Sequence, residues 1–338
     1  MQDIHSGRGC ALFDPHGDLY ESLRANIPER EVHRLIDFNL PHDNTLAFNP
    51  FAYVDRNRRV LIASSLMMAF KKLWSSYWGP RMEHFLRNTL LTLLELPHAT
   101  LADIPRIYLD RDYRNRALQL VSNEHVKSFW RNEFEKIPIR YRSEAISPIL
   151  NRTGAFLSNP VTQRLLTNRD GCINLREILD SGKIFLVNLS KGKLGEDTSF
   201  LVGGLLMACI EVQALSRADI LESARHDFNV YLDEFHAYTT DSLSSMMSEL
   251  RKYRVSLTLA NQFLTQIEAD VRDSILGNAG TVISFRLGSR DASVMAREFY
   301  PRFSIEDFEN LPNHHIYLRL MIEGVVSRAF SARTLLHE

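Results

Sequence analysis

Two adjacent carboxylates follow an apolar segment near the centre of the second half of the chain. The segment Phe228–Leu232 has the composition of a buried strand and runs directly into Asp233 and Glu234. At the carboxyl end of a strand in an open α/β sheet, such side chains face the ligand crevice. One carboxylate there can hold Mg²⁺, and the next can orient and deprotonate an attacking water. This is the Walker B arrangement, although Asp-Glu after a strand also occurs simply as a helix start, where negative charge is favourable.

Two further polar residues follow predicted strands. Gln262 follows the strand 256–260, and its amide can donate to a phosphate or a water and accept from the water. The alternative is a side chain that pairs with the backbone of its own loop. Asp14 ends the strand Gly9–Phe13 and is predicted to lie at the same edge of the sheet.

The sequence also excludes several kinds of site. A phosphate-binding loop of the form GxxxxGK[ST] does not occur in the 338 residues, so its backbone nest and its lysine are missing from this sequence. The histidines show no zinc spacing. The cysteines Cys10, Cys172 and Cys209 lie far apart, which excludes a disulfide scaffold.

Composition describes a globular chain with an uneven charge. It has 40 Lys and Arg against 41 Asp and Glu, a net charge of −1, and 45% hydrophobic residues. Residues 51–170 hold 19 basic and 11 acidic side chains, so the neutral total hides a basic middle third. A basic block can mark a nucleic-acid surface, or it can be an ordinary solvated helical surface rich in arginine.

The elements that must position these residues form an α/β pattern. Apolar strands near residues 9–13, 32–38, 184–189, 228–232, 256–260 and 281–285 alternate with helices, which predicts a mostly parallel sheet. Residues 316–321 and 325–331 predict a terminal hairpin around Glu323-Gly324. The basic block has apolar residues at helical spacing and predicts an all-helical insertion. The longest apolar run, Phe200–Ile210, is too short for a membrane span of about 20 residues and predicts a buried helix.

An ordered set of motifs gives the chain a family resemblance. They are DPHGDL (14–19), FNPF (48–51), WGPRMEHFLRNTLL (78–91), the pair Phe129-Trp130, ILNRTGAFLSNP (149–160), FLVNLSKGKLG (185–195), YLDEF (231–235), ELRKYRVSLTLANQ (249–262) and GNAGTVISFRLGSRDA (277–292). The chain resembles the TraG/TraD-type coupling proteins of type IV secretion and conjugation, within the HerA/FtsK group of P-loop ATPases. The resemblance covers nearly the whole sequence. It implies a hexameric DNA translocase driven by ATP and Mg²⁺, with a RecA-like core split by an all-helical domain.

The resemblance implies three regions and a missing motif. They are the first strands of the RecA-like core (1–51), the basic all-helical insertion (52–175) and the rest of the core with the hairpin (176–338). In the family, the Walker A motif comes just before the strand that leads into DPHGDL. We therefore expect this sequence to be a fragment that starts after that motif.

The resemblance also implies roles for single residues. Asp233 is the carboxylate associated with Mg²⁺, Glu234 the catalytic base, Gln262 the sensor of the γ-phosphate and Asp14 an accessory acid. Arg286 is a candidate arginine finger, with an ion pair to Asp291 or to a carboxylate at the sheet edge as the alternative. Lys191 and Lys252 are candidates for contacts with phosphate or DNA. The densest basic stretch gives the DNA-binding candidates Arg56, Arg58, Arg59, Lys71, Lys72 and Arg81.

Three functional hypotheses follow. The first is a DNA-translocating ATPase in the cytoplasm, working at the inner face of the membrane through a further N-terminal region, with relaxosome or secretion-channel proteins as partners. The second is a non-catalytic module that binds DNA or packs into a ring without turning over ATP. The third is a DExH-type helicase, because Asp233 to His236 fits D-E-x-H, but neither an SAT-like triplet nor the arginine motif of helicases follows.

Overall fold

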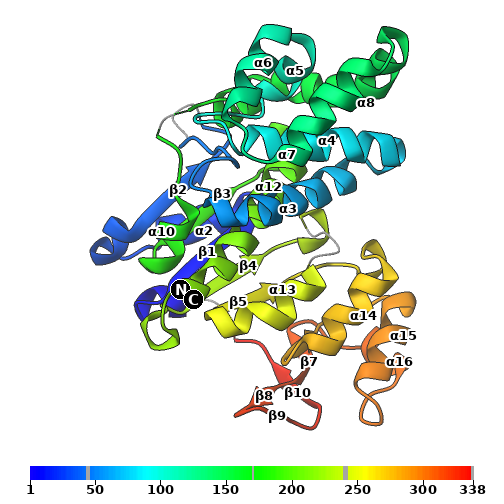
Figure 1. Cartoon of the computed structure of the whole chain (residues 1–338). Helices are drawn as coiled ribbons and strands as arrows, with labels where there is room; N and C mark the ends of the chain where they lie inside the picture. Colours follow the sequence, from blue (N-terminus) through cyan, green and yellow to red (C-terminus); the bar gives the residue numbers. More distant parts are fainter. Residues whose placement is uncertain (43–45, 170, 239–242, 336–338) are drawn as a thin grey trace. The chain divides into compact units, whose positions relative to one another are not determined.

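The chain forms two compact units. The computed structural model describes residues 1–42, 46–169, 171–238 and 243–335 (Figure 1). The first unit comprises Met1–Ser242 and Glu249–Ala260, and the second comprises Leu243–Ser248 and Asn261–Glu338.

A five-stranded sheet in the order β2-β3-β1-β4-β5 is the centre of the first unit. Every neighbouring pair is parallel, and the register pairs Cys10 with Ile184 and Phe13 with Leu232. The strands are β1 (Gly9–Asp14), β2 (Leu35–Asn39), β3 (Ile184–Asn188), β4 (Phe228–Leu232) and β5 (Val255–Leu259). The predicted α/β class with a mostly parallel sheet is therefore confirmed.

Helices cover both faces of this sheet. The helices of the first unit, including those of the region between β2 and β3, are α1 (Gln2–His5), α2 (Asp18–Ala25), α3 (Arg59–Leu73), α4 (Pro80–Leu93), α5 (Asp103–Leu109), α6 (Arg111–Leu120), α7 (Glu124–Ser128), α8 (Ile139–Leu157), α9 (Pro160–Leu166), α10 (Leu175–Asp180), α11 (Lys191–Leu194) and α12 (Glu196–Ser216). On one face, Tyr20 of α2 packs against Cys10 and Ile184. The other face carries Phe13 and Phe185, whose rings meet edge to face. Strand β3 is buried along its whole length, as its continuous apolar sequence predicts.

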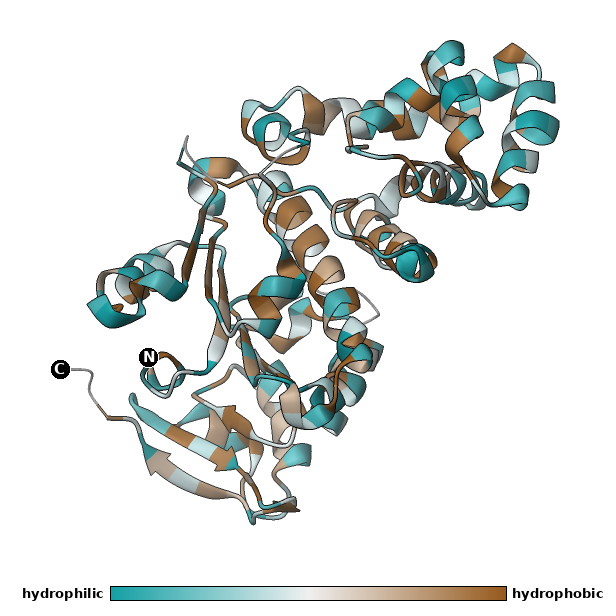
Figure 2. Cartoon of the chain, turned by 60° about the vertical axis from the view of Figure 1, so that its left-hand side comes forward, coloured by the Kyte–Doolittle hydropathy of each residue, from teal (hydrophilic) through white to brown (hydrophobic). Residues whose placement is uncertain are grey.

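Helix α12 is the most apolar helix of the core. The segment Glu196–Asp219 is long and apolar enough to cross a membrane by composition, but 89% of its most apolar window is buried in the fold. It packs along α3, and Figure 2 shows apolar residues concentrated on the sheet and the adjacent helices. The predicted buried helix around Phe200–Ile210 is confirmed.

The region between β2 and β3 is helical, as the apolar spacing predicts. Its described residues contain no strand beyond the single bridge between Ala47 and Cys172. Pro80 begins α4, where its missing N–H loses no helical hydrogen bond. The limits 52–175 stay a prediction.

The second unit has its own antiparallel sheet in the order β10-β7-β6. Its elements are α13 (Leu243–Glu249, all but the last residue), α14 (Ala269–Asn278), β6 (Val282–Ser284), α15 (Ser289–Glu298), α16 (Ile305–Glu309), β7 (His315–Arg319), β8 (Met321–Ile322), β9 (Val325–Val326) and β10 (Phe330–Arg333). The predicted terminal hairpin is confirmed, since β7 pairs with β10, and β8 with β9, on either side of Glu323-Gly324.

The prediction that the strand 281–285 joins the parallel sheet is wrong. Strand β6 pairs antiparallel with β7, and Val282 packs in a separate core with Ala292, Met295 and Phe308. The sequence of a short apolar strand does not indicate which strand it will pair with. Here the partner is β7, a strand of the nearby hairpin.

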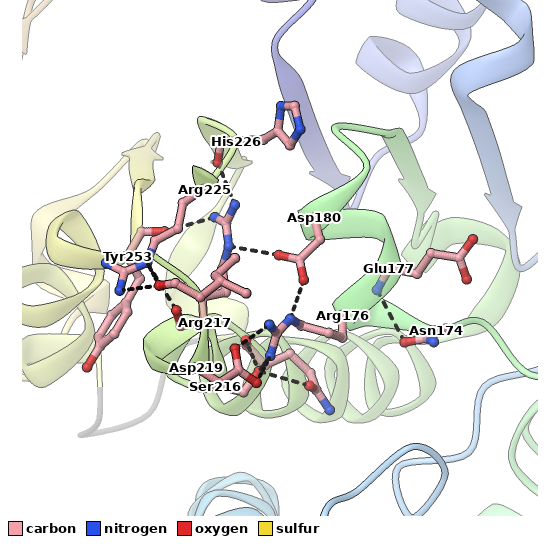
Figure 3. A network of polar contacts seen from close by, with 12 residues as sticks. Asn174, Arg176, Glu177, Asp180, Ser216, Arg217, Asp219, Arg225, His226 and Tyr253 are labelled. Atoms are coloured by element: carbon pink, nitrogen blue, oxygen red, sulfur yellow. Dashed lines mark hydrogen bonds and ion pairs between the residues drawn. The ribbon is translucent and has the colours of Figure 1, made fainter. Parts of the chain in front are cut away.

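A buried arginine connects the segments that lead into three strands of the parallel sheet. Arg217 follows α12 and is fully buried. It donates to the carbonyl of Tyr253 before β5 (2.8 Å) and of His226 before β4 (2.7 Å), and lies 3.0 Å from the carboxylate of Asp180 before β3 (Figure 3). The amino ends of β3, β4 and β5 are thus fixed to the end of α12, and the opposite ends of these strands carry the candidate site.

Candidate functional site

The carboxyl ends of β1, β3 and β4 are joined by backbone hydrogen bonds. The amide of Asp233 donates to the carbonyl of Phe13 (3.1 Å), and the amide of Leu189 donates to the carbonyl of Asp14 (2.9 Å). The amide of Lys191 donates to the carbonyl of Pro15 (2.8 Å). Four of the residues singled out from the sequence, namely Asp14, Lys191, Asp233 and Glu234, therefore lie at one edge of one sheet.

Asp14 is completely buried and holds the turn that follows β1. Its two carboxylate oxygens accept from the amides of His16 and Tyr20, each at 2.8 Å. The carbonyl of His16 in turn accepts from the hydroxyl of Ser190 (2.8 Å), next to Gly17 at a φ of 95°. Both oxygens of Asp14 are thus engaged with backbone, and its influence on the site is that of a fixed negative charge. Its role as an accessory acid stays a prediction.

Asp233 is half-buried beside two other carboxylates. Burial raises the pKa of Asp233, and the charges of Asp14 and Glu234 raise it further, while the amide of Glu234 opposes this. A group of negative charges at a partly desolvated position favours a cation. No group of three or more His, Cys, Asp or Glu residues within the described ranges could hold a metal ion by itself. The donor set suits Mg²⁺, which proteins usually bind through one or two carboxylates together with substrate phosphates.

Glu234 is 5% exposed and has a backbone conformation that is rare for a glutamate. Its φ is 46°, in the left-handed region, at the turn between β4 and the next helical turn. Strained backbone of this kind gathers at functional sites because the surrounding structure has to hold it there. Two bonds hold the turn, from the amide of Ala260 to the carbonyl of Leu232 (2.9 Å) and from the amide of Phe235 to the carbonyl of Ala260 (3.2 Å).

A histidine that the sequence pointed to only through the D-E-x-H pattern contacts Glu234. The Nδ1 of His236 lies 3.3 Å from a carboxylate oxygen of Glu234. The main-chain carbonyl of His236 accepts from the Nζ of Lys72 on α3 (2.5 Å). His236 therefore lies where its ring can orient the carboxylate of Glu234. The only signal in the sequence was its spacing, two residues after Glu234.

The predicted lysines differ in their surroundings. Lys191 begins the short helix α11 at the carboxyl edge and is half-buried. Lys252 is exposed, with its ammonium group 5.6 Å from the centre of the Tyr253 ring. Contacts of these two residues with phosphate or DNA stay predictions.

Gln262 and Arg286 belong to the second unit, where both are exposed. In the part of the chain that the structure describes, Arg286 forms no ion pair, so the alternative of a bond to Asp291 is wrong there. Asp291 is buried and accepts instead from the amide of Leu264 (3.0 Å). The sensor and finger roles stay predictions.

The basic stretch at the start of the helical region is partly engaged within the first unit. Arg58 donates to the carbonyl of Ser216 (3.2 Å), and Arg59 lies 3.3 Å from a carboxylate oxygen of Glu95. The remaining candidates are Arg56, which donates to the hydroxyl of Ser122, Lys72, described above, and the exposed Lys71 and Arg81. Lys71 and Arg81 are therefore the stronger candidates for contacts with DNA phosphates.

Comparison with known proteins gives a family model that matches part of the chain. Residues 227–296 match the family model described as the TraM recognition site of TraD and TraG. No curated protein sequence is significantly similar to the chain.

Solved structures extend the likeness to the whole chain. The plasmid coupling protein TrwB in complex with ADP and Mg²⁺ aligns with a TM-score of 0.68 at 13% identity, covering 99% of this chain and 80% of that one. VirB4 of Thermoanaerobacter pseudethanolicus aligns with a TM-score of 0.63 at 10% identity, covering 99% and 83%. The chain thus has the RecA-like fold of these proteins, and the resemblance to TraG/TraD-type proteins is confirmed.

Proposed function

We propose that this chain is part of an ATP-driven, DNA-translocating coupling motor for conjugation or type IV secretion, and that it carries the Walker B side of the nucleotide site without the phosphate-binding loop. The observation that carries the proposal is the position of Asp233 and Glu234 at the carboxyl end of β4, beside Asp14, in a fold shared with the coupling protein TrwB. That relative was solved with ADP and Mg²⁺. We infer the same ligand class here, ATP with Mg²⁺.

Each residue at the edge then has a chemical task. Asp233 is the carboxylate that would hold Mg²⁺, since both oxygens of Asp14 are already bound to backbone amides. Bound Mg²⁺ would neutralise charge on the transferred phosphate. Glu234, oriented by His236, accepts the proton of the attacking water. Lys191 contacts phosphate from the end of β3.

Two residues of the second unit also have proposed roles. Gln262 contacts the γ-phosphate or the attacking water through its side-chain amide. Arg286 stabilises the transition state in a neighbouring subunit, as an arginine supplied from outside a site can do. The exposure of both side chains supports these roles.

The proposed partners follow from the same likeness. They are DNA, further copies of the chain in a hexamer, and relaxosome or secretion-channel proteins; the name of the matching family model includes a recognition site for TraM. We place the motor on the cytoplasmic side of the membrane, where DNA would enter a secretion channel. The exposed Lys71 and Arg81 are the contacts with DNA phosphates that we favour.

One observation favours a second candidate function. The sequence holds no GxxxxGK[ST], so this chain does not supply the backbone nest that cradles phosphates in P-loop enzymes. A chain that keeps the fold and the basic surface without this loop would bind DNA or pack into a ring without turning over ATP.

Hydrolysis of ATP by the purified chain, with Mg²⁺ and with or without DNA, separates the two functions. The motor predicts hydrolysis that Glu234→Gln reduces by about a hundredfold or more, the usual contribution of a general base. Glu222→Gln, the same change at an exposed position of the first unit, is the matched control and should leave the rate unchanged.

The absence of hydrolysis, together with DNA affinity that falls steeply with salt, would favour the second candidate. Equal rates for the wild type and Glu234→Gln would refute the catalytic role of Glu234.

A further inference from the structure

The loop that carries Gln262 is attached to helix α15 of the same unit. The amide of Leu264 donates to the Oδ2 of Asp291 at 3.0 Å. The Leu264 side chain packs against the core that contains Ala292 and Met295. The loop is thus held at one point by a polar and an apolar contact.

Asp291 is an unusual residue to find in this core. It is 4% exposed, and its second oxygen, Oδ1, is buried without a hydrogen-bond partner among the described residues. Burying a carboxylate costs free energy of desolvation, so a buried carboxylate is expected to make interactions that offset this cost. The first turn of α15 lowers this cost, because the amino end of a helix favours negative charge.

The loop itself presents two exposed residues beside this attachment. The side-chain amide of Asn261 donates to the carbonyl of Phe263, and the amide of Ile267 donates to the carbonyl of Leu264 (3.1 Å). Gln262 and Phe263 lie between these contacts, and Phe263 is 54% exposed. Fixing Leu264 therefore limits the positions that Gln262, two residues earlier, can take.

We propose that Asp291 is a positioning residue, which fixes the loop carrying Gln262 to helix α15 so that the second unit sets the conformation of the sensor. The importance of Gln262 for hydrolysis rests on the proposed function. The attachment itself rests only on the contacts above. A carboxylate that served merely to stabilise the start of α15 would affect that helix and leave the loop unchanged.

Hydrogen exchange on the full chain tests the attachment without any need for activity. In Asp291→Ala, the amides of residues 262–267 should exchange roughly tenfold faster, the factor expected when a charge-assisted hydrogen bond is lost. Asp291→Asn keeps an acceptor oxygen and should restore most of the protection. The matched control is Asp307→Ala, which removes a first-turn carboxylate from α16 and should loosen α16 while leaving residues 262–267 as they are.

Two results would overturn the attachment. One is unchanged exchange at residues 262–267 in Asp291→Ala, and the other is faster exchange confined to α15. If Asp291→Ala unfolds the second unit, Leu264→Pro replaces it, because this change removes the N–H donor and leaves Asp291 in place; Leu264→Ala, which keeps the N–H, is the control for the lost apolar side chain. In Leu264→Pro, the remaining amides of the loop should then exchange faster to the same extent.

ATP hydrolysis tests whether Asp291 acts through Gln262. Gln262→Ala and Asp291→Ala should both lower kcat with little change in KM, and the double variant should be no worse than Gln262→Ala, since residues that act as a unit are not additive. Additive losses would overturn the positioning role. If the wild-type chain hydrolyses no ATP, the proposed function fails, and the exchange measurement alone decides the attachment.

Discussion

Two adjacent glycines of α12 should differ in their response to the same substitution. A Cβ added at Gly203 would lie 2.4 Å from Cδ1 and 2.7 Å from Cε1 of the Tyr238 ring, and 3.0 Å from Cδ1 of Leu189. A Cβ added at Gly204 would meet only the Cβ of Ala69, at 3.8 Å. Tyr238 is almost fully buried, so its ring cannot move aside into solvent.

The expected size of the effect follows from two terms. Replacing glycine by alanine within a helix stabilises the fold by about 1 kcal/mol, and this term is shared by both positions. Overpacking a core costs about 1–3 kcal/mol, and this term applies only at Gly203. Gly204→Ala should therefore be about 1 kcal/mol more stable than the wild type, and Gly203→Ala about 1–3 kcal/mol less stable than Gly204→Ala.

Urea and thermal unfolding of the two variants measure this difference directly. For domains of 150–250 residues, each kcal/mol shifts Tm by about 2–4 °C, so the two melting temperatures should differ by about 2–12 °C. Replacing Tyr238 by Leu removes the ring, and the double variant Gly203→Ala/Tyr238→Leu should recover at least about 1 kcal/mol relative to additivity. Equal shifts of the same sign for Gly203→Ala and Gly204→Ala would refute the close packing of α12 on Tyr238.

Two further predictions concern charged residues of the first unit. Arg217→Met removes a fully buried guanidinium and leaves the carbonyls of Tyr253 and His226 without this donor, while Asp180 keeps its bond from Arg176, so unfolding should need about 1–3 kcal/mol less for each unpaired carbonyl. The same change at the exposed Arg140 should alter the free energy of unfolding by under about 0.5 kcal/mol, and a similar loss at both sites would contradict the network in Figure 3. Burial raises the pKa of Asp233, and the charges of Asp14 and Glu234 raise it further. The folded chain therefore keeps the carboxyl proton of Asp233 to a higher pH than the unfolded chain does. The free energy of unfolding decreases as pH rises from the ordinary pKa of aspartate through this raised pKa. Asp233→Asn should therefore raise Tm at neutral pH by an amount that shrinks as pH falls toward the ordinary pKa of aspartate; a Tm gain that is the same at all pH values would contradict this cause.

Much of the fold was predictable because its signals are local. The apolar run Ile184–Asn188 is buried along its whole length, and strands that are covered on both faces have such runs. The carboxyl ends of parallel strands meet at one edge of the sheet, so the places of Asp14 and of the Asp233-Glu234 pair followed from the strand pattern. The predicted sheet of β6 was wrong, because the three residues of this strand do not indicate that its partner is antiparallel and lies in another sheet.

The amino-acid sequence by itself determined which residues are candidates for chemistry and which strands end beside them, because side-chain type and hydrophobic periodicity act over a few residues. The tertiary structure alone decided how these side chains are engaged. It placed His236 against Glu234, used both oxygens of Asp14 for backbone amides, and directed Asp291 toward Leu264 rather than Arg286. Such contacts depend on burial and on how closely segments that can be far apart in the chain approach each other. Local sequence predicts neither the burial nor the approach. The type of a side chain sets the interactions that it can form, and the packing around it in the folded chain determines which of these it forms.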